Sequence, residues 1–150
     1  MVVFLIGGES RLMDGLINKF NKDGHRVYLL TGNRNGRTSY QKVFEKYNFN
    51  YDSDSIREIF ESTNPDVVIF TGAQDTHYRW ENARKEAVQF STDLTNILSA
   101  YSSVKNGRFL YLSSEDVFGK SYPEDIRETE SVSANSFHAL AVAQGEETCK

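Results

Sequence analysis

Four short runs of almost entirely apolar residues alternate with segments of helical periodicity, and this alternation limits what the chain can fold into. The runs are residues 2–6 (VVFLI), 25–36 (HRVYLLTGNRNG, which runs into a Gly/Asn turn), 67–73 (VVIFTGA) and 108–114 (RFLYLSS). Strands without polar alternation are typical of parallel sheets, because both faces of each strand are buried. The pattern therefore predicts a parallel sheet that is covered by helices on both sides.

Four helices are predicted between and after these runs. The first ends at the Asp-Gly pair 23–24, and the second has capping-box spacing between Ser55 and Glu58 and ends at the Asn-Pro pair 64–65. The third covers residues 82–100, and the fourth begins with Ser133 as its cap. The segment between the second strand and the second helix is predicted to be a loop. This order predicts a doubly wound α/β domain.

Composition and charge exclude several other classes of protein. The 150 residues amount to one domain, 1–150, without repeats or linkers. A net charge of −4 with scattered Lys and Arg predicts no nucleic-acid partner. The single cysteine, Cys149, allows neither an internal disulfide nor a CxxC metal site, so we expect no metal and a cytoplasmic protein. The apolar start MVVFLIGG is too short for a signal peptide or a membrane span.

Each apolar run ends in small or polar residues. These are Gly7-Gly8, Thr31-Gly32, Thr71-Gly72-Ala73 and Ser113-Ser114. The ligands of open α/β sheets bind outside the carboxyl ends of the strands, which meet at one edge. A row of small side chains at that edge predicts a cofactor lying across it.

Four stretches carry a resemblance to a known family. They are VVFLIGG at the first turn, NPDVVIFTGAQ in mid-sheet, GRFLYLSSEDVFG at the last strand and SANSFHALA on the last helix. They resemble the glycine-rich turn, the PDxVIHLAA strand, the SSxxVYG strand end and the YxxxK helix of the extended short-chain dehydrogenase/reductases, the NAD-dependent epimerase/dehydratase group. The resemblance covers nearly the whole chain and implies a Rossmann-like doubly wound parallel sheet flanked by helices. The family's C-terminal strands and substrate domain are missing, so a fragment of a longer chain or a reduced member is expected.

The glycine-rich turn is only partly kept. The family's GxxGxxG pattern falls on Gly7, Ser10 and Met13, and it implies that Gly7, Gly8 and Ser10 contact the pyrophosphate of the cofactor. Met13, in place of the third glycine, is expected to push the following helix outward unless Gly15 takes that role. An ordinary strand–helix turn around a glycine pair explains the same residues.

The resemblance implies NAD or NADP as the cofactor. Arg34 and Arg37 stand where the family selects its adenosine ribose, and arginine suits the 2′-phosphate of NADP, so the preference tilts toward NADP. Solvated loop arginines are the alternative. Asp52 falls near the family's acidic cofactor contacts or starts a helix, and Phe49 is the alternative contact for the adenine. The stretch that passes under the cofactor is matched by Thr71, Gly72 and Ala73.

The strand end at 113–119 matches the family's catalytic segment. By resemblance, Ser114 polarises the substrate, and Glu115 and Asp116 stand where the dehydratases place an acid and a base, in reversed order. A carboxylate pair beside a hydroxyl can divide acid and base roles when burial separates their pKa values. The alternative is a capped strand end with two exposed carboxylates.

The rest of the family's catalytic set is replaced. Its tyrosine and lysine fall on Phe137 and Ala141, which have no proton to exchange and no ammonium. A literal YxxxK at residues 101–105 precedes the serine strand and is expected at the wrong edge of the sheet. His138 could be a substitute base, but it lies one position, about 100°, from Phe137 along the helix and is interpreted as structural. Tyr122 is a looser candidate.

Three functions remain open. The first is an NAD(P)-binding domain of the nucleotide-sugar epimerase/dehydratase type with weak or lost catalysis. The second is an active enzyme that uses Ser114, Glu115 and Asp116, and the third is a non-catalytic protein-interaction module. Expected partners are a dinucleotide and a nucleotide-sugar substrate, with no membrane. The resemblance also implies a homodimer formed through the two long helices; small residues at Ala139, Ala141 and Ala143 fit this or packing on the sheet.

Overall fold

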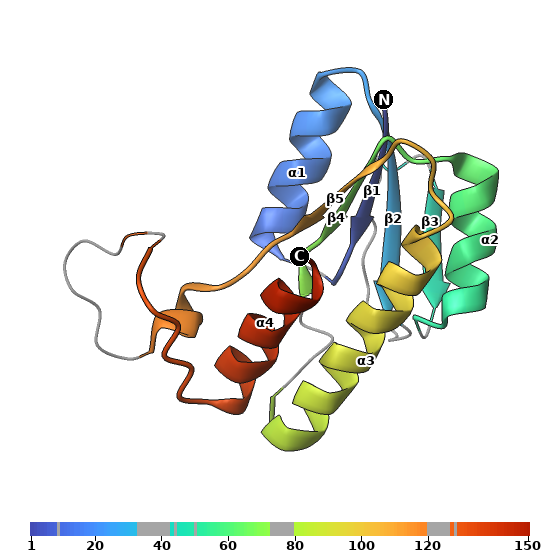
Figure 1. The fold of residues 1–150 in the computed structure, drawn as a ribbon. Coiled ribbons are helices and arrows are strands. Elements are labelled where there is room, and N and C mark those ends of the chain that lie inside the picture. Colours follow the sequence, from blue (N-terminus) through green and yellow to red (C-terminus); the bar gives the residue numbers. More distant parts are fainter. Residues whose placement is uncertain are drawn as a thin grey trace.

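The computed structural model describes residues 1–8, 10–32, 43, 51–72, 80–119, 127 and 129–150, together with the backbone of residues 45–49. Within these ranges, five strands form one sheet: β1 (Val2–Ile6), β2 (Arg26–Gly32), β3 (Glu45–Phe49), β4 (Val67–Phe70) and β5 (Arg108–Tyr111). All neighbouring strands pair in parallel, in the order β3-β2-β1-β4-β5 (Figure 1). The predicted Rossmann-like parallel sheet is confirmed.

Strand β3 corrects the prediction of a loop between the second strand and the second helix. Its sequence, EKYNF, contains no continuous apolar run and therefore gives no signal for a buried strand. It forms because its backbone pairs with β2, from Tyr28 opposite Glu45 to Gly32 opposite Phe49. Backbone pairing at the side of a sheet needs less apolar sequence than a central position does.

The described helices are α1 (Arg11–Lys22), α2 (Ser53–Thr63), α3 (Ala83–Tyr101) and α4 (Phe137–Thr148), with a short 3₁₀ helix, η2 (Glu115–Phe118). Helix α1 packs on one face of the sheet, and α2, α3 and α4 pack on the other (Figure 1). Alternate residues of β1 reach opposite cores, with Phe4 and Ile6 toward α2–α4 and Val3 and Leu5 toward α1. This explains why the strands are apolar without alternation.

Two helices begin at other caps than the sequence predicts. The carboxylate of Asp52 accepts a hydrogen bond from the backbone N–H of Ser55 at 2.9 Å, so Asp52 rather than the Ser55–Glu58 capping box begins α2. Ser136 Oγ accepts from Ala139 N–H at 3.0 Å and begins α4, three residues after the predicted Ser133. Both caps leave their helices' apolar faces where the periodicity places them.

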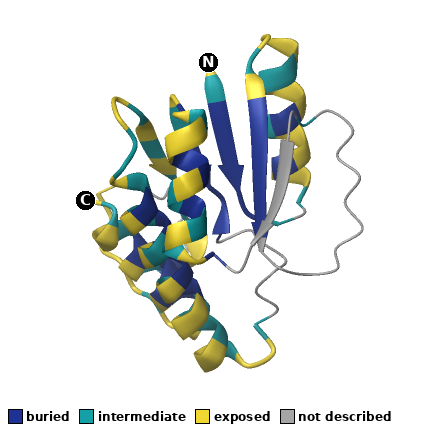
Figure 2. Cartoon of the chain, turned by 90° about the vertical axis from the view of Figure 1, so that its right-hand side faces the viewer, coloured by how far each residue is buried: buried dark blue, intermediate teal, exposed yellow. Residues whose placement is uncertain are grey.

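The buried residues lie in the two cores between the sheet and the helices on its two faces (Figure 2). The central strands β1 and β4 are buried along most of their length, while β5 alternates, with Leu110 about half exposed. None of the helices in the described ranges is long and apolar enough to cross a membrane.

Candidate functional site

The segments that follow β1, β4 and β5 lie at one edge of the sheet, because the strands are parallel (Figure 1). This edge holds Gly7, Thr71 and Ser114, three of the residues that the sequence places in a site. Ligands of open α/β sheets bind at this edge, next to the strand where the chain order reverses, here β1. The candidate site is therefore built from the ends of β1, β4 and β5.

Gly7 and Thr71 form a close contact at the centre of this edge. Gly7 has a φ of +150°, and a Cβ at this position would overlap Thr71 Oγ1 and lie 3.4 Å from Thr71 Cβ. Thr71 is buried, and its hydroxyl donates to the carbonyl of Ile6 at 3.2 Å. Only glycine therefore fits at position 7.

Ser10 and Met13 occupy the second and third positions of the glycine pattern. Ser10 is the N-cap of α1, and its Oγ accepts from Met13 N–H at 3.1 Å. Accepting that bond leaves the hydroxyl proton able to donate. Met13 is fully buried and packs between α1 and the sheet with Val3, Leu5 and Ile17.

Gly15 does not replace the third glycine. It lies on the exposed side of α1, where an added Cβ would meet no atom within 4 Å. The close approach of helix and strand is instead at Gly7, where the Met13 Cε lies 3.5 Å from the Cβ position. Met13 therefore packs between α1 and the strand end at Gly7.

Of the other residues that the sequence places in the site, the structure describes some and not others. Arg34, Arg37, Ala73 and the looser candidate Tyr122 lie outside the described residues, as does the side chain of Phe49. Gly72 is buried, and a Cβ there would lie 2.6 Å from Phe70 Cε1, so glycine is required.

Asp52 caps α2 at the same edge of the sheet. The backbone N–H of Ser55, followed by the Ser55 hydroxyl, lowers the pKa of its carboxyl, because both donate to the charged form. The helix-start interpretation of Asp52 is confirmed, and its cofactor contact stays a prediction.

Ser114, Glu115 and Asp116 open the short helix η2 directly after β5. Ser114 is its N-cap: its Oγ accepts from Asp116 N–H at 3.3 Å and lies 3.3 Å from Asp116 Oδ2. Glu115 and Asp116 are exposed. The structure thus brings the serine and the second carboxylate together, while Glu115 stays a candidate on sequence grounds.

The sequence interpretation took His138 as structural and did not single out Trp80. His138 Nδ1 lies 3.0 Å from Asp116 Oδ2. The indole of Trp80 meets the imidazole edge to face, with ring centroids 4.6 Å apart at 80°. The rotation of about 100° that separates His138 from Phe137 was the available signal, since it turns His138 toward η2.

The positions of the missing tyrosine and lysine have opposite environments. Phe137 is 49% exposed, whereas Ala141 is 3% exposed and belongs to the core beneath α4. The literal YxxxK pair begins at Tyr101, the last residue of α3, where the chain turns into the start of β5. Tyr101 packs on Phe109 at the opposite edge of the sheet, as predicted.

Tyr111 fixes α4 on β5 and so fixes the position of His138. Its hydroxyl donates to the carbonyl of Val142 at 3.0 Å, and its ring lies directly under Gly145. Burial, followed by the charges of Cys149 and Glu146, raises its pKa far above the ordinary value. The Tyr111 hydroxyl is therefore a permanent donor that holds the helix.

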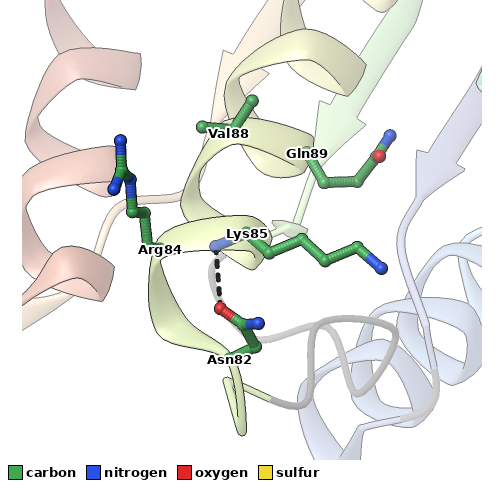
Figure 3. Close-up of a pocket in the computed structure, with 5 residues that line it drawn as sticks. All are labelled: Asn82, Arg84, Lys85, Val88 and Gln89. Atoms are coloured by element: carbon green, nitrogen blue, oxygen red, sulfur yellow. Dashed lines mark hydrogen bonds between the residues drawn. The ribbon is translucent and has the colours of Figure 1, made fainter.

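A shallow surface hollow lies at the start of α3 (Figure 3). Asn82 caps the helix, its Oδ1 accepting from Lys85 N–H at 3.3 Å. Lys85 and Gln89 project to one side and Arg84 to another (Figure 3). The sequence interpretation did not single out this hollow.

The model of the NAD dependent epimerase/dehydratase family matches residues 3–150, almost the whole chain. The chain belongs to this family. No curated protein matches it.

Solved structures share the fold at low sequence identity. The enzyme WbmH of Bordetella bronchiseptica, in complex with NAD+, is 18% identical with a TM-score of 0.77, over 97% of this chain and 50% of that one. UDP-glucose-4-epimerase from Stenotrophomonas maltophila, with bound NAD and formylated UDP-arabinopyranose, is 16% identical with a TM-score of 0.80, over 99% and 47%. UDP-glucose 4-epimerase from Thermotoga maritima, with UDP-glucose, is 16% identical with a TM-score of 0.77, over 99% and 50%. The chain spans about half the length of these proteins.

Proposed function

We propose that this chain binds NAD or NADP as the dinucleotide-binding part of a nucleotide-sugar epimerase/dehydratase-type protein. The observation that carries the proposal is the contact of Gly7 with Thr71, which requires a glycine in the turn after β1. Such a turn lets a pyrophosphate approach the backbone at the start of the next helix. Family membership and the NAD-bound structural neighbours support it.

The start of α1 fits an anionic group in two further ways. The first N–H groups of the helix and its dipole favour negative charge, and the Ser10 hydroxyl retains a proton to donate. Met13 faces the sheet core rather than the turn, so its bulk does not occupy the place of a phosphate.

Catalysis by the family's tyrosine route is weak or lost in this proposal. When bound, the dinucleotide supplies a nicotinamide ring that accepts or returns a hydride. Phe137 cannot exchange a proton with the substrate, and Ala141 lies in the core, where it offers no ammonium to a ribose. An active enzyme using Ser114, Glu115 and Asp116 is the second candidate, supported by the 3.3 Å contact between the Ser114 hydroxyl and the Asp116 carboxylate.

We further propose that the protein is a cytoplasmic homodimer and that it prefers NADP to NAD. Arg34 supports the preference on sequence grounds. Helices α3 and α4 pack side by side, with Val88 and Leu140 mostly exposed on them, which supports pairing through these helices. Ala139 and Ala141 are buried within one chain, so they are not part of such a surface.

Isothermal titration calorimetry with NAD+, NADP+, NADH and NADPH tests the proposal. We expect saturable binding that Ser10→Asp weakens at least tenfold, because aspartate keeps the N-cap of α1 but repels the phosphates. Gly15→Ala, on the exposed side of the same helix, is the control and should bind as the wild type does. Arg34→Ala should weaken the binding of NADP+ and NADPH, which carry the 2′-phosphate, and leave the binding of NAD+ and NADH unchanged. Absence of binding at millimolar dinucleotide would refute the proposal and favour an interaction module.

A further inference from the structure

The peptide that joins Ile6 to Gly7 is held from both sides of β1. Its N–H donates to the carbonyl of Leu30 in β2 at 3.0 Å. Its carbonyl oxygen, that of Ile6, accepts from the N–H of Thr71 at 2.9 Å and from the Thr71 hydroxyl at 3.2 Å. A carbonyl oxygen has two lone pairs, so Thr71, which directly follows β4, can satisfy both of them. The last peptide of β1 is therefore fixed before the turn begins.

The same hydroxyl limits the space at Gly7. Thr71 Oγ1 is the atom nearest to the place that a Cβ would take at Gly7, and Met13 Cε lies 3.5 Å from that place. Thr71 is 1% exposed and Met13 is fully buried, so neither side chain can turn away into solvent. Gly7 is thus enclosed by two buried side chains, one after β4 and one in α1.

The residues after this held peptide form the part of the turn that would meet a ligand. Gly8 comes next, and Ser10 is the N-cap of α1. In open α/β sheets the backbone N–H groups of this turn and of the helix start approach the pyrophosphate of a dinucleotide. Binding is tighter when such groups already have the bound geometry, because less order has to be gained. The direction in which the chain leaves β1 determines where these N–H groups lie.

We propose that Thr71 is a positioning residue for dinucleotide binding, which acts by holding the Ile6 carbonyl and enclosing Gly7. The inference rests on the proposed function and deepens it. The Thr71 side chain is buried, and the single proton of its hydroxyl is donated to Ile6. Thr71 therefore acts through the backbone of the turn and does not itself contact the cofactor.

Calorimetric titration with NAD+, together with urea denaturation, separates this role from a purely structural one. Thr71→Val replaces the hydroxyl by a methyl group, which is larger and cannot donate. Thr71→Ser keeps the hydroxyl and loses the buried methyl group. Both variants should be less stable than the wild type, but only Thr71→Val should weaken NAD+ binding, by about fivefold or more, while Thr71→Ser binds within about twofold of the wild type.

Thr95→Val is the matched control. The Thr95 hydroxyl also donates to a backbone carbonyl, that of Ser91 at 2.8 Å, but on the exposed side of α3. This variant should bind NAD+ as the wild type does. Unchanged affinity in Thr71→Val, or an equal loss in Thr71→Val and Thr71→Ser, would overturn the inference while the wild type still binds. Absence of binding by the wild type would instead refute the proposed function and the inference with it.

A double-mutant cycle of Gly7→Ala with Thr71→Ala tests the contact itself, even where Thr71→Val does not fold. Without the hydroxyl, the atoms nearest to a Cβ at position 7 are the Cβ of residue 71 at 3.4 Å and Met13 Cε at 3.5 Å, which are ordinary contacts. Gly7→Ala should therefore shift the urea midpoint less in the Thr71→Ala background than in the wild type. The φ of +150° is common to both backgrounds and cancels. Equal shifts would show that Thr71 does not constrain Gly7 and would overturn the inference.

Discussion

Gly145, near the C-terminal end of α4, is the position where one added methyl group tests how that helix packs on β5. A Cβ at Gly145 would lie 2.7 Å from Tyr111 Cζ and 3.1 Å from Leu94 Cδ2, and closer still to the Tyr111 hydroxyl. Real Cβ atoms essentially never approach other heavy atoms within 3.0 Å. The Tyr111 ring cannot turn away freely, because it bonds to the Val142 carbonyl and stacks on Phe70 at 5.9 Å.

Two opposing terms decide the free energy of unfolding of Gly145→Ala. Alanine in a helix interior is favoured over glycine by about 1 kcal/mol. Overpacking a core costs about 1–3 kcal/mol, and displacing the Tyr111 hydroxyl from Val142 costs about 1 kcal/mol more. The net expectation is a destabilisation of about 1–3 kcal/mol, which reverses the sign of the helix preference.

Urea denaturation followed by circular dichroism measures the change, with Gly15→Ala as the matched control. Gly15 is in α1 with no atom within 4 Å of an added Cβ, so alanine should stabilise the protein there by about 0.5–1 kcal/mol. In the double variant, Tyr111→Phe removes the closest atom, so the two substitutions together should cost less than the sum of their separate effects. Stabilisation by Gly145→Ala equal to that by Gly15→Ala would refute the described packing of α4 on Tyr111.

Two other predictions concern a helix cap and the lost catalytic pair. Asp52→Ala should destabilise the protein by about 1 kcal/mol at pH 7 through loss of the α2 cap. The lowered pKa of Asp52 means that the stabilisation by its charged form is complete above the unfolded pKa near 4 and is lost as the pH falls further. The difference in stability between wild type and Asp52→Asn should therefore shrink below about pH 4, and a constant difference would contradict this. Phe137→Tyr should leave stability within about 0.5 kcal/mol, whereas Ala141→Lys should cost about 2–4 kcal/mol because it buries an ammonium. Gln144→Lys, exposed on the same helix, is the control, and equal urea midpoints for the two lysine variants would contradict the burial of Ala141.

The sequence predicts β1, β2, β4 and β5 correctly and misses β3, which lies at one side of the sheet. The runs that became β1 and β4 are apolar on both faces, because helices cover both faces, and such runs are recognisable in isolation. Strand β3 has no such signal, since its residues EKYNF gain their structure from pairing with β2. The observed starts of α2 and α4 differ from the predicted ones for a related reason. Several Ser and Asp side chains in each segment can cap a helix, and the tertiary structure determines which of them does so.

The candidate site was predicted in part. Gly7 and Thr71 were both expected at the ligand edge, but their contact, and the reason why Gly7 cannot be replaced, require the two strands to be adjacent. The pairing of Asp116 with His138 joins residues 22 positions apart on different elements, and no local pattern encodes it. His138 therefore looked like an isolated histidine.

The sequence by itself determined the class of fold and the absence of the family's tyrosine and lysine, and it predicted the edge of the sheet at which we propose a ligand to bind. These follow from hydrophobic periodicity and residue identity, which are local properties. Only the tertiary structure decided that Met13 points into the core, that Gly15 is unused, and that His138 meets Asp116 beneath Trp80. Those outcomes depend on the orientation and position of each helix on the sheet, and packing between residues that are distant in the sequence determines both.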